Sequence, residues 1–263
     1  MDTNEKIDQW VRDAFKHENF KEIKVTITGF SEKGDGYVGD IAFAKANVIT
    51  SDGETKNLEL VIKYGKLNDS LREALPVRLA FEREIYVYGK VVPQLQKFLD
   101  EKKVKLLCQF LPKCYGTLLY DKEEVIVLEN LKAQYYDLHD RYQPLNINHL
   151  KLTLEMYGKW HALSFAYQDQ NPEKARILFE NLQDIMRTFL ESIDNCLVDV
   201  QEILYTILQQ KNEVELIEGM KKRNPNFKTT FYDLSEMENE KSVFLHGDCW
   251  NSNFMFKYGS DKS

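Results

Sequence analysis

One stretch near the end of the printed sequence decides the fold, Val243-Phe-Leu-His-Gly-Asp-Cys-Trp-Asn-Ser-Asn-Phe-Met-Phe256. Its first three and last three residues are apolar, which predicts two short strands with a polar loop between them. The loop carries His246, Asp248 and Asn253 in the pattern H-x-D-x-x-x-x-N. An aspartate alone in a loop is usually a turn residue. An aspartate and an asparagine at this spacing, between two apolar segments, form a more specific pattern.

The catalytic loop of protein kinases, H-R-D-x-x-x-x-N, has the same spacing. In that loop the aspartate accepts the proton of a substrate hydroxyl and the asparagine holds a metal ion on the nucleotide phosphates. We therefore interpret Asp248 as the catalytic base and Asn253 as a magnesium ligand, because magnesium prefers oxygen ligands. His246 is a further catalytic-loop residue that we expect to orient the loop by hydrogen bonds. Trp250 is interpreted as a core anchor or as part of the pocket wall.

The composition fits a folded enzyme and excludes several other classes. The chain has 263 residues, 43% of them hydrophobic, which is enough for one large domain or two lobes. No apolar run reaches the roughly 18 residues of a membrane span, and the first ten residues are too polar for a secretory signal. A net charge of −7 argues against nucleic acid as a partner. Four cysteines without a CxxC pair indicate reduced thiols in a cytoplasmic protein rather than disulfides or a zinc site.

The first half of the chain predicts a sheet of about five strands with one inserted helix. An amphipathic helix is expected over Asn4–Phe20 and a second helix over Ser70–Val92. Pro76 should start or kink that second helix, Pro93 should break it, and a short helix is expected over Gln94–Leu99. Strands are expected at Ile23–Ile27, Tyr37–Thr50, Leu58–Tyr64, Lys105–Leu111, Cys114–Leu119 and Glu124–Leu128.

The second half is predicted to be helical. A long helix is expected over Ile147–Tyr167, capped by Asn146 or Asn148, and Pro172 should open the next one. Further helices are expected at Val198–Leu208 and Val214–Met220, followed by a charged loop at Lys221–Asn226.

This order of elements predicts an α+β, protein-kinase-like bilobal fold with an antiparallel β N-terminal lobe and a mostly helical C-terminal lobe. The lobes are expected to cover residues 1–130 and 131–263, with the boundary between Glu129 and Gln134. The N-terminal lobe would bind nucleotide and the C-terminal lobe would carry the catalytic loop.

A glycine-rich segment, Gly34-Asp-Gly-Tyr-Val-Gly39, lies between the first two expected strands. A dinucleotide-binding G-x-G-x-x-G needs a helix after it, whereas here a strand follows. We therefore favour a kinase-type hairpin that covers phosphates, with Gly34, Asp35, Gly36 and Tyr37 as nucleotide-binding candidates. An ordinary glycine-rich hairpin turn is the alternative.

Lys63 ends the apolar run of the third expected strand, where a charge is costly without a partner. The following helix offers Glu82 and Glu84, which point to different faces, so only one can pair with it. We expect Glu84, because its neighbourhood is more apolar. The alternatives are a lysine that reaches solvent and two solvated surface carboxylates.

The strand Val125–Leu131 runs into a polar exit, as a connector between two lobes requires. Its backbone would face the adenine ring, which makes Glu129 and Leu131 nucleotide-binding candidates. A plain core strand is the alternative and is compatible with this interpretation.

Taken together, these segments resemble the ecdysteroid kinase-like family, also described as CHK kinase-like, within the choline kinase and aminoglycoside phosphotransferase group. The resemblance implies a kinase-like fold, ATP and Mg2+ as cofactors, and phosphorylation of a hydroxyl on a small molecule such as an ecdysteroid or a hydroxylated xenobiotic. From the net charge and the lack of a long apolar run, we expect neither a nucleic-acid nor a membrane partner. The residues that carry it are Lys33–Tyr37, Val61–Lys63, Phe81–Tyr86, Val127–Leu131, Asp140–Arg141, Trp160–Ser164 and Leu245–Phe256.

The sequence departs from the family pattern at three places. Gly36 stands where the family loop usually has asparagine, and Asn130 where the hinge usually has aspartate. The family also implies a second metal-binding aspartate on a return strand, and Asp261 in Tyr258-Gly-Ser-Asp-Lys-Ser263 does not follow an apolar strand. We therefore expect a C-terminally truncated member with weak or no activity. A non-catalytic nucleotide-binding or regulatory protein, or an incomplete gene model, is the alternative.

Overall fold

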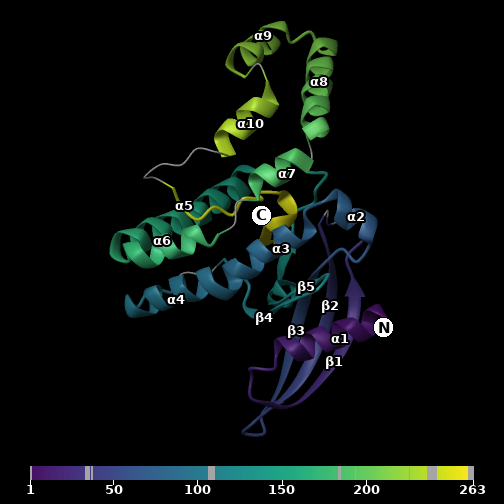
Figure 1. Ribbon diagram of the computed structural model, residues 1–263, viewed down its shortest axis with the longest axis vertical. Coiled ribbons are helices and arrows are strands. Elements are labelled where there is room, and N and C mark those ends of the chain that lie inside the picture. The colour runs from purple at the N-terminus through teal and green to yellow at the C-terminus, as the bar shows by residue number, and fades with distance from the viewer. Residues whose placement is uncertain are drawn as a thin grey trace.

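The computed structural model describes residues 2–32, 36, 38–105, 110–182, 185–192, 194–224, 226–235 and 242–259. A β-rich part lies at one end of the elongated molecule and helices make up the rest (Figure 1). This is the expected α+β, kinase-like architecture. The strand expected over Lys105–Leu111 has its centre outside the described residues, and its described ends are not strand.

The described sheet has five antiparallel strands in the order β1-β2-β3-β5-β4. The first three pair in direct succession, as alternation of apolar and polar residues predicts, and the expected Asp-Gly turn has Gly53 at φ +89°. The strands are β1 Phe20–Phe30, β2 Gly39–Thr50, β3 Thr55–Gly65, β4 Cys114–Tyr120 and β5 Glu123–Glu129.

Helix α1 (Thr3–Ala14) packs on one face of the sheet. Its apolar side chains Ile7, Trp10 and Val11 join the inward residues of the strands in one core. The helix begins at a capping box formed by Asp2 and Glu5. It ends earlier than the predicted Phe20, which instead pairs with Thr50 as the first residue of β1.

A nearly continuous helical rod crosses the opposite face of the sheet. After α2 (Asp69–Ala74), Pro76 caps α3 (Val77–Tyr86), which passes through a π turn, η1 (Val87–Val91), into α4 (Val92–Glu101). The predicted break at Pro93 is wrong. Pro93 lies in the first turn of α4, where a residue without an N–H is tolerated.

The remaining helices form a second layer beyond this rod. Asn146 caps the long helix α5, as expected, by accepting from the backbone of Asn148 and His149. Helices α8, α9 and α10 extend away from α5 and α6 (Figure 1), and α10 was not expected from the sequence. The helices are α5 Ile147–Gln170, α6 Pro172–Glu180, α7 Met186–Ser192, α8 Asp194–Gln210, α9 Val214–Arg223 and α10 Phe227–Ser235.

The segment that opens the decisive stretch is not a strand, so the prediction for Val243–Leu245 is wrong. Phe244 is buried, but side chains of α5 satisfy its backbone. Its N–H donates to Ser164 Oγ at 3.0 Å and its carbonyl accepts from Trp160 Nε1. These two bonds replace the ladder that a neighbouring strand would supply.

The apolar end of the stretch does form a short strand. Strand β7 (Met255–Lys257) pairs with β6 (Tyr136–Leu138), which follows the 3-10 turn η3 (Leu131–Gln134). This pairing joins β6, which follows the five-stranded sheet in the chain, to β7, which follows the polar loop. Trp250 is 64% exposed, which overturns its interpretation as a core anchor.

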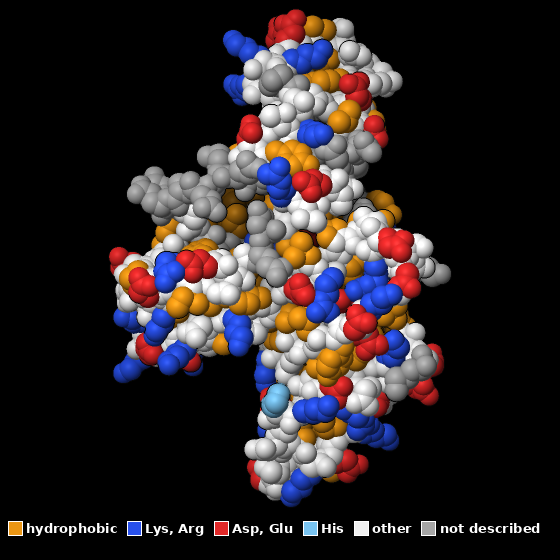
Figure 2. All heavy atoms as spheres, viewed as in Figure 1, with side chains coloured by type: hydrophobic (Ala, Val, Ile, Leu, Met, Phe, Trp, Pro, Cys, Tyr) orange, Lys and Arg blue, Asp and Glu red, His pale blue; other side chains and the backbone are white. Residues whose placement is uncertain are grey.

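The surface carries charges of both signs. Figure 2 shows acidic and basic side chains interspersed on the face in view. Among the described residues no helix combines the length and the apolar character that crossing a bilayer requires.

Candidate active site

An ion pair joins the sheet to helix α3. Lys63 Nζ lies 2.5 Å from Glu84 Oε2, and the two side chains are 30% and 31% exposed. Lys63 points to the α3 face because its neighbours Ile62 and Tyr64 point into the core under α1. The structure thus pairs Lys63 with Glu84 and not with Glu82, which instead accepts from Arg78 Nε at 2.6 Å.

The Glu84 carboxylate lies among groups that stay neutral near pH 7. Burial, together with the charge of Glu84, raises the pKa of the Cys114 thiol to about 11. Burial also raises the pKa of Tyr88, with Glu84 again adding to the effect. Lys63 therefore supplies a positive counter-charge to a carboxylate in partly apolar surroundings.

The polar loop is tied together by its own predicted residues. Asn253 Nδ2 donates to Asp248 Oδ2 at 2.7 Å and to the Asp248 carbonyl at 3.0 Å. The Asp248 N–H donates to His246 Nδ1 at 3.2 Å. Between them, Gly247 has φ +82°, a conformation that residues with a side chain rarely adopt. All three predicted residues of the loop are therefore close together, and the Asp248 carboxylate is open to solvent.

The loop and the Lys63–Glu84 pair lie within electrostatic reach of each other. Burial lowers the pKa of His246; the charges of Asp248 and Glu84 act to raise this pKa, and that of Lys63 acts to lower it. A neutral imidazole can accept the Asp248 N–H, in agreement with an orienting role for His246. Glu84 and Lys63, which are about 160 and 180 positions earlier in the chain, thus lie near enough to His246 for their charges to act on its ring.

Sequence reasoning missed Tyr157, on α5. Its hydroxyl donates to Cys249 Sγ at 2.7 Å, and its ring meets Phe254 edge-on at 6.0 Å. Burial, then Cys249 and the charge of Asp248, raise the pKa of Tyr157, so it remains a donor. A signal was present, because Tyr157, Trp160 and Ser164 are spaced as one helix face, and the structure turns that face toward residues 244–249.

Glu129 and Leu131, the two residues predicted to contact the adenine ring, lie where β5 leaves the sheet. The Glu129 N–H donates to the Lys113 carbonyl at 2.8 Å, and its carboxylate accepts from Gln134 Nε2. Leu131 begins η3, and Asn130 caps that turn by accepting from the Lys132 N–H at 3.1 Å. The Asn130 N–H still donates to the Glu59 carbonyl of β3 at 2.9 Å, so the chain leaves the sheet after Asn130.

Of the glycine-rich segment, Gly34, Asp35 and Tyr37 lie outside the described residues, and their predicted role stays a prediction. A Cβ on Gly36 would meet the Gly39 carbonyl. A Cβ on Gly39 would lie 2.9 Å from the Phe81 ring of α3. Both positions therefore need glycine for space, and the second lets α3 approach the start of β2 closely.

The described residues contain no group of three or more histidine, cysteine or acidic side chains placed to hold a metal. The loop nevertheless has the right donor chemistry for magnesium. Both bonds from the Asn253 side chain to Asp248 use Nδ2, so neither of them involves the side-chain oxygen Oδ1. Two hard oxygen donors are the ligand type that magnesium prefers, with water and phosphate oxygens as its other ligands.

A family model described as the ecdysteroid kinase-like family matches residues 33–263. The chain belongs to the ecdysteroid kinase-like family. The match covers most of the chain, including Lys63, Glu84 and the whole polar loop. No curated protein and no solved structure gave a match. Membership in the ecdysteroid kinase-like family indicates a kinase-like phosphotransferase.

Proposed function

We propose that the protein transfers the γ-phosphoryl group of Mg-ATP to a hydroxyl of a small molecule, with an ecdysteroid or a hydroxylated xenobiotic as the substrate class. The observation that carries the proposal is that both parts form as contacts, Lys63 Nζ to Glu84 Oε2 at 2.5 Å and Asn253 Nδ2 to Asp248 Oδ2 at 2.7 Å. The charges of both parts also act on His246. Phosphoryl transfer depends mainly on positioning and on charge stabilisation, which such a pair of parts provides.

Each part has a role in this proposal. Lys63, held by Glu84, binds phosphate oxygens, and Asp248 orients the acceptor hydroxyl and takes its proton. Bound Mg-ATP supplies the phosphoryl group and a metal charge, with Asn253 as the residue that would hold the metal. The backbone at Glu129 and Leu131 would contact the adenine, and Gly34, Asp35, Gly36 and Tyr37 would cover the phosphates.

A second candidate function is nucleotide binding without transfer. It is favoured by the small number of metal ligands among the described residues, where the polar loop offers one carboxylate, from Asp248, and one amide oxygen, from Asn253. The same arrangement would serve a regulatory kinase-like protein that holds Mg-ATP and does not turn it over.

One experiment separates the two functions. The protein is incubated with Mg-ATP and a panel of hydroxylated steroids and small alcohols, and ADP and phosphorylated product are measured beside Asp248→Asn. We expect the variant to keep nucleotide affinity and to lose about 10²- to 10⁴-fold in turnover, the range for removal of a general base. Equal turnover in both proteins would overturn the role of Asp248. Nucleotide binding without turnover on any acceptor would support the second function against the first.

A further inference from the structure

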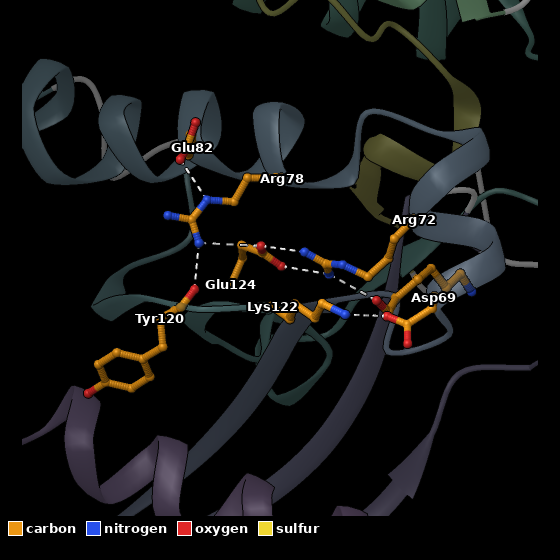
Figure 3. Close-up of polar contacts among 8 residues, drawn as sticks. Asp69, Arg72, Arg78, Glu82, Tyr120, Lys122 and Glu124 are labelled. Carbon is orange, nitrogen blue, oxygen red and sulfur yellow. Dashed lines mark hydrogen bonds and ion pairs between the residues drawn. The ribbon is translucent and has the colours of Figure 1, made fainter.

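A fully buried carboxylate lies at the start of β5, outside the site described above. Glu124 has 0% side-chain exposure and accepts two hydrogen bonds from Arg72, Nη2 to Oε1 at 2.6 Å and Nη1 to Oε2 at 2.9 Å (Figure 3). Arg78 Nη1 lies 3.5 Å from the same Oε1 atom. The predicted nucleotide contacts and catalytic steps do not use any of these three residues.

The network joins three elements through one side chain. Glu124 belongs to β5, Arg72 to α2 and Arg78 to α3, as Figure 3 shows. Arg72 also donates to the Lys66 carbonyl at 2.9 Å, just after β3. Arg78 donates to the Tyr120 carbonyl at the end of β4. The start of α3 is therefore fixed to the sheet by bonds with defined directions.

The other end of α3 carries Glu84. Arg78 is six residues before Glu84, so about 9 Å of helix separates the two anchors at 1.5 Å per residue. Phe81, which lies between them, and Val77, just before Arg78, pack on Ile126. Ile126 is the β5 residue that pairs with Lys63 in the sheet. Helix α3 is thus held on β5 at its start by Glu124 and reaches Lys63 at its end.

Gly65 makes room for this carboxylate. A Cβ at Gly65 would meet Glu124 Oε2, and it would lie 3.1 Å from Val77 and 3.2 Å from Arg72 Nη1. Buried ion pairs rarely add stability over apolar packing of the same volume, whereas loss of one partner is costly. We therefore expect the network to contribute mainly through the directions of its hydrogen bonds, which fix where α2 and α3 lie on the sheet.

We propose that Glu124 is a positioning residue for the Lys63–Glu84 pair and acts through Arg72 and Arg78. It holds the start of α3 on β5 so that the end of the helix presents Glu84 to Lys63. The effect on nucleotide binding rests on the proposed function, whereas the effect on Lys63 itself does not.

The test compares Glu124→Gln, which keeps shape and removes charge, with two controls. Lys122→Met removes the exposed Lys122–Asp69 pair, which joins α2 to the neighbouring β4–β5 turn. Val48→Ala removes buried volume from the core under α1, away from α3. Arg78→Met is a milder second variant, because Arg78 is partly exposed.

Two readouts do not depend on turnover. Amide hydrogen exchange is followed over residues 77–86, and the rate at which an amine reagent modifies Lys63 is followed by mass spectrometry. We expect Glu124→Gln to accelerate both by about tenfold, because local opening of α3 becomes easier, and Arg78→Met to do so less. Lys122→Met should behave as wild type, since exposed pairs contribute little.

A third readout is the Michaelis constant for Mg-ATP. We expect Glu124→Gln to raise it about tenfold or more, because small misplacements of a binding group cost that much. Unchanged amide exchange and unchanged Lys63 reactivity in Glu124→Gln would overturn the proposal. It would also be overturned if Val48→Ala, at the same loss of unfolding free energy, accelerated amide exchange and Lys63 modification as much as Glu124→Gln does. If wild type binds no nucleotide, the proposed function fails, and the first two readouts still decide the role of Glu124.

Discussion

Asn253 donates twice to Asp248 through a single nitrogen, to the carboxylate at 2.7 Å and to the backbone carbonyl at 3.0 Å. This closes the polar loop on itself and fixes the direction of the proposed base. The same geometry keeps the amide oxygen of Asn253 available for a metal.

The first prediction concerns this contact. Asn253→Ala should lower turnover by about 10²-fold or more, because the proposed base loses its orientation and the metal a ligand. The melting temperature should change little, since both residues are exposed. Turnover and thermal unfolding are measured beside Ser252→Ala, an exposed neighbour that should behave as wild type. Full turnover in Asn253→Ala would contradict the assignment.

The second prediction concerns the ion pair on α3. Lys63→Met and Glu84→Gln should each weaken Mg-ATP binding about tenfold or more, and the double variant should be no weaker than Lys63→Met, because Glu84 acts through Lys63. Calorimetric titration measures this cycle. The matched control is the exposed Lys45–Glu59 pair between β2 and β3, where Glu59→Gln should leave affinity unchanged. Additive losses at positions 63 and 84 would argue against the coupling.

The third prediction concerns the support beneath the loop. Ser164→Ala leaves the buried Phe244 N–H without its 3.0 Å acceptor and should lower the free energy of unfolding by about 1–3 kcal/mol. Denaturant unfolding measures the change. Ser192→Ala is the control, because its hydroxyl bonds a carbonyl on an exposed helix turn and its loss should cost far less. A loss at Ser164 no larger than at Ser192 would show that Phe244 finds another partner.

The fourth prediction is a pH dependence at the β6–β7 contact. His149 Nδ1 accepts from the Asn146 N–H, and its Nε2 lies 3.0 Å from the Tyr258 hydroxyl, which also lies 3.3 Å from His139 Nδ1. Burial, and then the neighbouring His139, lower the pKa of His149 in the folded protein.

The sign of the effect follows from that shift. The unfolded chain binds a proton near pH 6.5 and the folded protein only at lower pH, so stability is full above about 6.5 and is lost as the pH falls. The free energy of unfolding of wild type should therefore approach that of His149→Gln as the pH falls below about 6.5. A gap between the two proteins that stays constant over this range would refute the shift. NMR titration of the His149 ring measures the pKa directly.

Much of the β-rich half followed from local patterns. Alternation of apolar residues predicted β1 to β3 and their pairing, because each strand contacts the next one in the sequence. The Lys63–Glu84 pairing also followed, because a charge at the end of an apolar strand needs a partner on the next helix. The three residues of the polar loop lie together, as their spacing indicated.

The features that were missed depend on distant partners. The segment Val243–Leu245 has the pattern of a strand, but the groups that satisfy its backbone are side chains of α5, about 80 residues away. Glu124 was predicted only as the first residue of a strand, and its partners Arg72 and Arg78 lie about 50 residues earlier. Tyr157 was overlooked because its partner Cys249 is 92 residues later. Local spacing places Tyr157, Trp160 and Ser164 on one helix face, but it does not identify the distant residues that this face contacts.

The π turn η1 joins α3 to α4 in one rod. At one end the rod carries Glu84, and at the other Leu95 and Phe98 share a core with Trp160, whose indole bonds the Phe244 carbonyl two residues before His246. A π turn holds one more residue than an α turn. Deleting that residue would turn η1 into an α turn and leave the direction of Glu84 relative to α4 almost unchanged. Deleting a residue from the regular turns of α3 after Glu84 or of α4 before Leu95 would instead rotate Glu84 by about 100° around the axis. The π turn is therefore the place where the rod can carry one extra residue while Glu84 still faces Lys63.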